Sequence, residues 1–252
     1  MNLIFGNWCF SPRLVTSLLA AVLFGLFVHL GFWQLDRAEQ KRNLFAEFES
    51  RQASEAVDLN REGNAHLVAE DLLWRPVVAK GEFLEHYQIL LDNQVDNTKA
   101  GYFAYTLFKL SDSDNVVLVN RGWLLADPDR AISPELTVTK GLVSITAVAK
   151  DIPQTGLLLK ELPPEQMGDG IYRVQRIDLD ELAELAQVKL LPYIIRLEPL
   201  SEHGYRRQWR LPGSGENVNN GYAFQWFAFA TALLIIYLLL NVKRKDEKGQ
   251  EV

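Results

Sequence analysis

The chain has 252 residues, a net charge of −6 and a mean hydropathy of −0.05, and its arginines form no continuous basic stripe, which argues against nucleic-acid binding. Its lone cysteine, Cys9, excludes an intramolecular disulfide. Without a partner thiol or a methionine cluster, this cysteine also makes a poor carrier site for a soft metal such as copper.

The first long apolar segment covers residues 14–35, and His29 is its only ionisable side chain. At about 1.5 Å of rise per residue, a helix of this length crosses the roughly 30 Å hydrocarbon core of a bilayer. The run is longer than that of a secretory signal peptide, no small-residue cleavage site follows it, and no amphipathic presequence precedes it. We expect a retained transmembrane helix.

A second apolar segment, residues 222–242, is also long enough to span a bilayer. Two spans place both termini on one side of the membrane and the intervening domain on the other. The predicted division is a cytoplasmic N-terminus (1–13), a first span (14–35), an exported domain (36–221), a second span (222–242) and a cytoplasmic basic tail (243–252).

The positive charges near the spans point in both directions. The tail carries Lys243, Arg244, Lys245 and Lys248, which favour a cytoplasmic C-terminus, whereas arginines and lysines at 37–42 and 206–210 favour the opposite orientation. Long segments are translocated largely regardless of their charge. We therefore expect both termini in the cytoplasm and the central domain in the periplasm, with the protein in a bacterial inner membrane.

Short β-rich runs fill the exported domain. Their valine, isoleucine, tyrosine and phenylalanine content and their alternation suit strands with one buried face. The predicted strands are residues 73–83, 87–95, 101–111, 115–126, 142–151, 170–178 and 191–199. Turn-forming residues at 92–94 and 112–115 fit the ends and hairpins of such strands. We predict an antiparallel sheet curled into a barrel or a sandwich.

Two helical patterns accompany the strands. Residues 36–52 are good helix formers with apolar residues at helical spacing, so the first helix should continue beyond the membrane. Residues 178–186 combine an acidic first turn with an apolar face and predict one short helix. The predicted fold class is α+β, with two transmembrane helices flanking an exported β-rich domain.

Signatures of catalysis are missing from the sequence. It contains no GxSxG or HExxH motif, no phosphate-binding glycine-rich loop and no CxxCH motif. His66, His86 and His203 are scattered, and no nucleophile and base form a recognisable pair. We expect a protein without enzymatic turnover; a membrane-tethered envelope hydrolase is the alternative from another class.

Polar and aromatic residues gather at the outer ends of both spans. His29 and Trp33 share one face of the first helix, and Tyr222, Gln225, Trp226 and Phe229 share one face of the second. One interpretation is an aromatic belt at the membrane interface with Gln225 bonding to another helix. The other is a pocket for a flat apolar ligand, with His29 as an axial ligand to a metal.

Six ordered segments resemble one known family. LGFWQLDRAEQK at 30–41 is similar to the segment that ends the first span in the surfeit-locus-one family of cytochrome c oxidase assembly factors. The resemblance continues with WRPVVAKGEF (74–83), LLDNQ (90–94), Gly101-Tyr102, VLVNRGW (117–123) and GYAFQWFAFA (221–230). It implies a factor that binds haem a at the outer membrane face and assists its insertion into the catalytic subunit of a haem-copper oxidase, with haem A synthase as a second partner.

The resemblance carries residues over by motif. Trp33 and Arg37 match the first motif, Arg121, Gly122 and Trp123 the second, and Tyr222, Gln225 and Trp226 the third. Many members carry a histidine three residues before that tyrosine, and here the position is Asn219. An amide is a poor ligand for haem iron beside imidazole, so haem ligation is not carried over to Asn219.

Three accounts of haem a follow from Asn219. His29 ligates the haem from the other helix, or the haem is held without an axial protein bond, or this member assists assembly as a scaffold without a stable haem complex. Arg37 and Lys41 lie near the same face, where they either receive the haem propionates or bind lipid phosphates and acidic side chains.

The VNRGW segment has a structural interpretation. Strand alternation puts Arg121 and Trp123 on one face and Asn120 and Gly122 on the other. An arginine on an apolar face needs a partner, and Asp92 is the candidate for a buried pair that stabilises the sheet.

Overall fold

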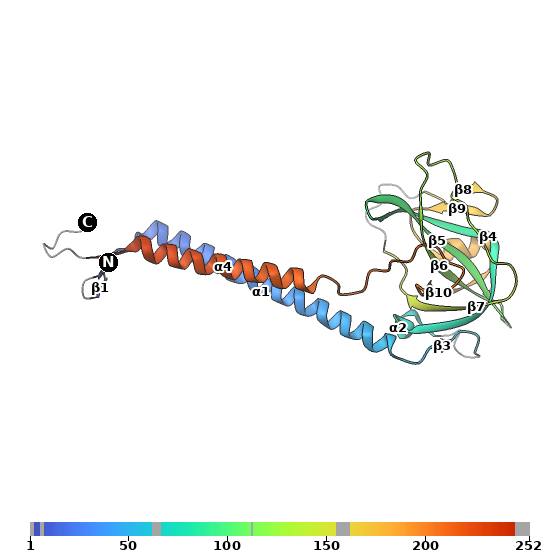
Figure 1. The fold of residues 1–252 in the computed structure, drawn as a ribbon, viewed down its shortest axis with the longest axis horizontal. Coiled ribbons are helices and arrows are strands. Elements are labelled where there is room, and N and C mark those ends of the chain that lie inside the picture. Colours follow the sequence, from blue (N-terminus) through green and yellow to red (C-terminus); the bar gives the residue numbers. More distant parts are fainter. Residues whose placement is uncertain (1–2, 6–7, 62–66, 112, 155–161, 245–252) are drawn as a thin grey trace. The chain divides into compact units, whose positions relative to one another are not determined.

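The computed structural model describes residues 3–5, 8–61, 67–111, 113–154 and 162–244 (Figure 1). The chain forms two compact units: a helical unit of Met1–Glu47 with Leu211–Val252, and a β unit of Phe48–Arg210. Three sequence-based features lie outside the described residues, namely His66, the hairpin residue Asp112 and the part of the basic tail beyond Arg244.

The helical unit consists mainly of two helices that lie side by side, α1 (Leu14–Gln52) and α4 (Glu216–Asn241) (Figure 1). Both are long and apolar enough to cross a membrane, which supports membrane anchoring. As expected, α1 continues well beyond residue 35. The second helix begins at Glu216, ahead of the predicted span, after Gly215 takes a left-handed φ of 90° at its N-cap.

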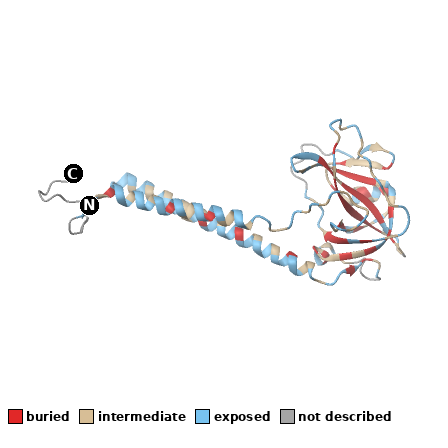
Figure 2. Cartoon of the chain, viewed as in Figure 1, coloured by how far each residue is buried: buried red, intermediate tan, exposed pale blue. Residues whose placement is uncertain are grey.

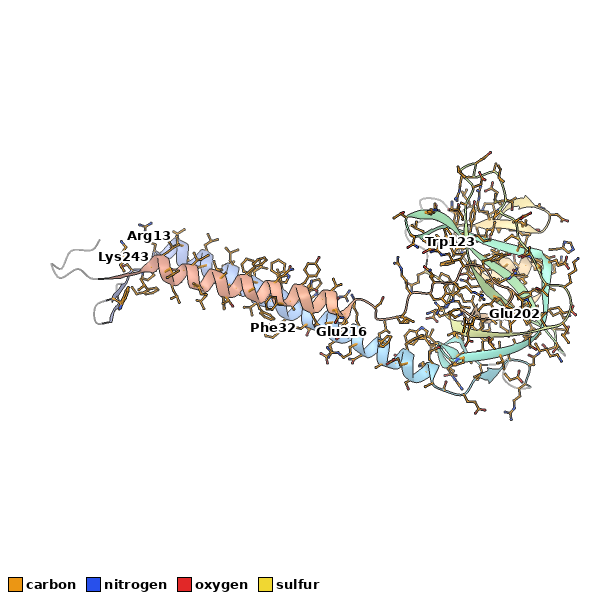
Figure 3. All side chains as sticks on the ribbon, in the orientation of Figure 1. Arg13, Phe32, Trp123, Glu202, Glu216 and Lys243 are labelled. Atoms are coloured by element: carbon orange, nitrogen blue, oxygen red, sulfur yellow. The ribbon has the colours of Figure 1, made fainter. Side chains whose placement is uncertain are left out.

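A small sheet lies at the end of the helical unit where α1 begins and α4 ends. It joins β1 (Leu3–Phe5), β2 (Trp8–Phe10) and β11 (Val242–Arg244) in antiparallel pairs. Figure 3 shows Arg13 and Lys243 at this same end of the helix pair. The first residue of α1 and the last residue of α4 therefore lie at the same end of the helix pair, as two antiparallel spans require.

Small residues form the contact line between α1 and α4, here called the helix seam. Gly31 and Ala38 are buried on α1, and Ala223 and Ala230 are buried on α4, each pair seven residues apart. Most other positions of both helices are exposed or half-buried (Figure 2). Without a large hydrophobic force between helices in lipid, close packing of small residues is what holds such a pair together.

The β unit is a barrel of five strands. These are β4 (Pro76–Asp96), β5 (Lys99–Leu110), β6 (Asn115–Leu125), β7 (Val143–Lys150) and β10 (Lys189–Leu197). Their order is β5-β6-β10-β7-β4, and β4 pairs again with β5 to close the barrel. Closure removes the exposed sheet edges that would otherwise invite aggregation.

Shorter elements extend the barrel. The strands are β3 (Val57–Asp58), β8 (Glu165–Gly168) and β9 (Ile171–Val174), and the helices are α2 (Ala69–Leu72) and α3 (Leu179–Ala186). The N-cap of α3 is Asp178, which accepts hydrogen bonds from the backbone amides of Asp180 and Glu181. These bonds cap the helix at the start that the acidic first turn predicts.

The predicted fold class is confirmed, with three differences in detail. Residues 73–83 and 87–95 belong to one strand, β4, whose register shifts between Phe83 and Gln88 instead of turning. The sheet is mixed, because β6 pairs with β10, β3 with β4 and β4 with β9 in parallel. The β unit also contains α2 in addition to the expected helix.

Two apolar clusters lie on opposite faces of the barrel wall. The inner cluster draws on all five barrel strands and includes Phe83, Val119 and Ile195. The outer cluster includes Leu118 and Ile194 and is covered by Leu182 of α3. Successive residues of β6 thus face opposite sides, as strand geometry requires.

Candidate functional site at the helix seam

A polar cluster interrupts the helix seam near the start of α4. Asn219 donates through Nδ2 to Oε1 of Gln34 at 2.6 Å, and Lys41 donates through Nζ to Oδ1 of Asn219 at 2.6 Å. Lys41 also reaches the carbonyl of Gly215 at 3.4 Å. Both polar groups of the Asn219 side chain are therefore engaged by α1.

Two further cations flank this cluster. Arg42 forms an ion pair with Glu216 at 2.7 Å, with the arginine side chain largely exposed. Arg37 is exposed and donates to Oε1 of Gln40 on its own helix at 3.1 Å. Arg37 and Lys41 are the two basic residues that could receive haem propionates. Lys41 donates to Asn219, and Arg37 is exposed on the surface.

An aromatic cluster lies one to two turns further into the helices. Phe27 stacks on Trp226 with ring centroids 5.7 Å apart and also contacts Phe229 at 6.0 Å. Phe32 meets Phe227 edge to face at 5.4 Å. Phe27 is missing from the sequence-based site, although it lies four residues before Gly31 and thus continues the line of seam residues.

The structure does not bring His29 and Trp33 against Tyr222, Gln225 and Trp226. His29 is exposed and lies two residues from both Phe27 and Gly31, which at about 100° per residue turns it away from α4. Trp33 and Tyr222 are about half exposed, and Gln225 is also exposed. These two faces do not meet, because the small residues of the seam determine which faces of α1 and α4 touch.

This geometry argues against haem ligation between the two helices. The side chain of Asn219 already bonds to Gln34 and Lys41, and His29, the single histidine of the helical unit, points away from the seam. Among the described residues, no group of three or more histidine, cysteine or acidic side chains is placed to hold a metal ion. A haem that uses His29 would lie on the outer face of α1.

The predicted pair of Arg121 and Asp92 is wrong. Arg121 is buried and donates to the carbonyls of His203 at 2.7 Å and Thr137 at 2.6 Å, and to Oγ1 of Thr106 at 3.3 Å. Three neutral acceptors satisfy the guanidinium without a carboxylate. Burial lowers the pKa of Arg121, whose side chain also lies over the ring of Phe83 at 5.0 Å.

Asp92 has a different partner. It forms an ion pair with Arg130, whose guanidinium lies over the ring of Tyr102 at 4.7 Å. Arg130 follows β6 in the chain, in a region without strand periodicity. Only the folding of that connection onto β4 creates this pair.

A β-bulge at Arg121 also changes the side-chain pattern of VNRGW. Tyr105 pairs with Asn120 and Ala104 with Gly122, so Arg121 is an extra residue in β6. As a result, Asn120 and Trp123 line the same outer hollow, whereas alternation predicts opposite faces. Gly122 has φ +120°, and a Cβ there would lie 2.7 Å from the carbonyl oxygen of Arg206.

The comparison with known families decides the membership of this chain. The sequence model of the SURF1 family matches residues 21–231. The chain belongs to the SURF1 family. The match begins within α1 and ends within α4, so it includes the whole barrel and part of each seam helix.

Several SURF1 family relatives resemble the chain over most of its length. A "SURF1-like protein" of Rickettsia bellii is 27% identical over 88% of this chain and 89% of its own. A "SURF1-like protein" of Monosiga brevicollis is 32% identical over 87% and 85%, respectively. The yeast "Cytochrome oxidase assembly protein SHY1" is 30% identical over 46% of this chain and 29% of its own length.

Proposed function

We propose that this protein is a membrane-anchored assembly factor for a haem-copper cytochrome oxidase. The SURF1 family match over residues 21–231 carries the proposal, because it covers the barrel and extends into both helices. The printed name of the yeast relative assigns it to cytochrome oxidase assembly. The two apolar helices put the factor in the membrane, where it meets its proposed partners, the catalytic oxidase subunit and haem A synthase.

The proposed orientation puts both termini in the cytoplasm of a bacterium and the β unit in the periplasm. The β1-β2-β11 sheet holds the segments before α1 and after α4 together, which supports an arrangement in which the residues between the two helices emerge on the opposite side. A reporter enzyme fused after Lys243 and a second fused in the exposed segment at Arg61 test this arrangement. Cytoplasmic activity of the internal reporter contradicts it.

The proposed cargo is haem a, and its attachment to this chain runs through His29. The imidazole is exposed on α1 and has Trp33 four residues further along the same face, where a flat ring has room. The engaged amide of Asn219 supports a site outside the seam. A haem held there is also accessible to an oxidase subunit that approaches α1 from the lipid.

Deletion of the gene tests the assembly role. We expect membranes of the deletion strain to lose most haem a absorbance and oxidase turnover, and the wild-type gene in trans to restore both. A plasmid that encodes the chain without residues 14–35 serves as the control for anchoring, because this variant lacks the apolar part of α1. Unchanged oxidase content in the deletion strain contradicts the assembly role.

Co-expression with haem A synthase tests the cargo. We expect purified wild type and His86→Ala, an exposed histidine of the β unit, to carry haem a, and His29→Ala to lose it. If wild type is free of haem a while Asn219→His binds it, His29 is not the ligand and the factor acts as a scaffold. Loss of haem a in His86→Ala alone also excludes His29 as the ligand.

A further inference from the structure

A hollow of about 340 Å³ opens on the outer face of the barrel, where β5, β6, β7 and β10 meet the segment after β10. We call it the Arg196 hollow, defined by Tyr105, Asn120, Trp123, Lys150, Arg196 and Trp209. Asn120 and Arg196 are direct partners in the parallel pairing of β6 with β10. The size falls within the roughly 300–1,000 Å³ of small-molecule sites.

Among the described residues, Arg196 has no counter-ion. Its Nε is buried without a hydrogen-bond partner, and within the described part of the chain the guanidinium forms no ion pair. The group instead lies over the ring of Trp209, 4.6 Å from its centroid. Burial lowers the pKa of Arg196 to about 10, so the side chain is still a cation at neutral pH.

Lys150 places a second cation at the same hollow. Burial lowers the pKa of Lys150, and the nearby positive charge of Arg196 lowers it further. Nearby Asp151 offsets this only in part, and it is exposed. Arg206 differs from both, since its Nε forms an ion pair with Asp96 at 3.0 Å. The hollow therefore holds two half-buried cations, Lys150 and Arg196.

Fixed aromatic rings border these cations. The indole of Trp209 donates to the carbonyl of Leu197 at 3.0 Å and packs against Phe103 with centroids 5.7 Å apart. The indole of Trp123 donates to the carbonyl of Gln94 at 3.0 Å. Rings held in this way present flat apolar surface without the entropy cost of ordering a loose side chain.

We propose that the Arg196 hollow binds a small flat carboxylate, with its carboxylate on Arg196 and Lys150 and its ring against Trp209. A guanidinium and a carboxylate match as two planar groups with parallel hydrogen bonds, and an ammonium adds a second charge. The guanidinium of Arg196 is half-buried and its Nε has no hydrogen-bond partner among the described residues, so an anionic ligand would supply the missing acceptor. The site goes beyond oxidase assembly and does not depend on haem.

Calorimetric titration of the full chain in a non-ionic detergent tests the site. The probe is 2-naphthoate, and its neutral isostere 2-naphthamide is the matched ligand control. We expect saturable binding of the acid and binding about tenfold weaker or worse for the amide, since a charge-assisted hydrogen bond contributes that much. Amide binding as tight as acid binding, or no binding of the acid, overturns the proposal.

Three variants assign the effect to the hollow. Arg196→Gln and Lys150→Met should each weaken 2-naphthoate about tenfold or more, whereas Arg61→Gln, an exposed arginine outside the hollow, should bind as wild type. Far-ultraviolet circular dichroism checks that each variant is folded. If Arg196→Gln does not fold, Lys150→Met decides. If folded Arg196→Gln and Lys150→Met bind 2-naphthoate with wild-type affinity, the site is excluded.

Discussion

Asn219 on α4 donates a hydrogen bond through Nδ2 to Oε1 of Gln34 on α1, and the two atoms lie 2.6 Å apart. The same side chain accepts from Lys41, so one amide joins two residues of the facing helix. A hydrogen bond between two helices stabilises the pair and fixes their alignment along the helix axes. Asn219 therefore has a structural role in the seam. A side chain at this position that binds a ligand could not form these bonds at the same time.

Replacing Asn219 with leucine should weaken the helix pair. The substitution removes both hydrogen bonds and leaves Gln34 and Lys41 without their partner, at a cost of about 1–2 kcal/mol. Titration of the detergent-solubilised protein with SDS, followed by circular dichroism of the helices, measures the change. The neighbouring Asn220→Leu, which makes no such pair, is the control, and equal effects of the two variants would contradict the role of Asn219.

Gly31 should tolerate no side chain while Phe227 is present. A Cβ at Gly31 would lie 2.6 Å from the Phe227 ring, so Gly31→Ala forces the helices apart and costs about 1–3 kcal/mol. In the double variant with Phe227→Ala we expect at least half of this loss to return. Gly25→Ala, where a Cβ meets nothing within 4 Å, should leave the same SDS midpoint unchanged.

Gly122→Ala should destabilise the β unit by about 2 kcal/mol or more, because it combines a left-handed φ with a collision. The φ of +120° disfavours any side chain, and the added Cβ would lie 2.7 Å from the Arg206 carbonyl. Urea unfolding followed by tryptophan fluorescence gives the free energy. Gly141→Ala separates the two causes, since its φ is +82° with open space around it, and it should lose only about 1 kcal/mol.

Tyr193→Phe should stabilise the protein by about 1 kcal/mol at neutral pH, because the tyrosine hydroxyl is buried without a hydrogen-bond partner among the described residues. Burial raises the pKa of Tyr193 to about 12 from an ordinary 10.0. The unfolded phenol ionises first, so the native state loses stability as the pH rises through that window.

The pH dependence gives Tyr193→Phe a second readout. The variant lacks this phenol, so its advantage over wild type should grow between about pH 10 and 12, as measured by urea unfolding at each pH. Arg121 and Lys150 have lowered pKa values and act in the opposite direction in both proteins, so they cancel in the difference. A constant difference across that range would contradict the raised pKa.

Local patterns in the sequence were sufficient for several elements. Residues 14–35 and 222–242 are apolar enough to reveal both spans, and the acidic turn after Asp178 marks the start of α3. The same local patterns failed where a long-range contact intervenes. The run broken at residues 84–86 is one strand, because β5 pairs with β4 both before the irregularity, at Phe83, and after it, from Gln88.

Reading the residues alone reveals the two apolar helices, the β-rich domain between them, the family motifs and the replacement of an expected histidine by Asn219. These features are local, since they depend on hydropathy, spacing and residue identity. Three features emerge only from the folded chain: the helix faces that meet, the bonds of Arg121 to the carbonyls of His203 and Thr137, and the lack of a counter-ion for Arg196 among the described residues. Such pairings depend on close packing between distant segments, and a periodic pattern carries no information about the distant partner of each face.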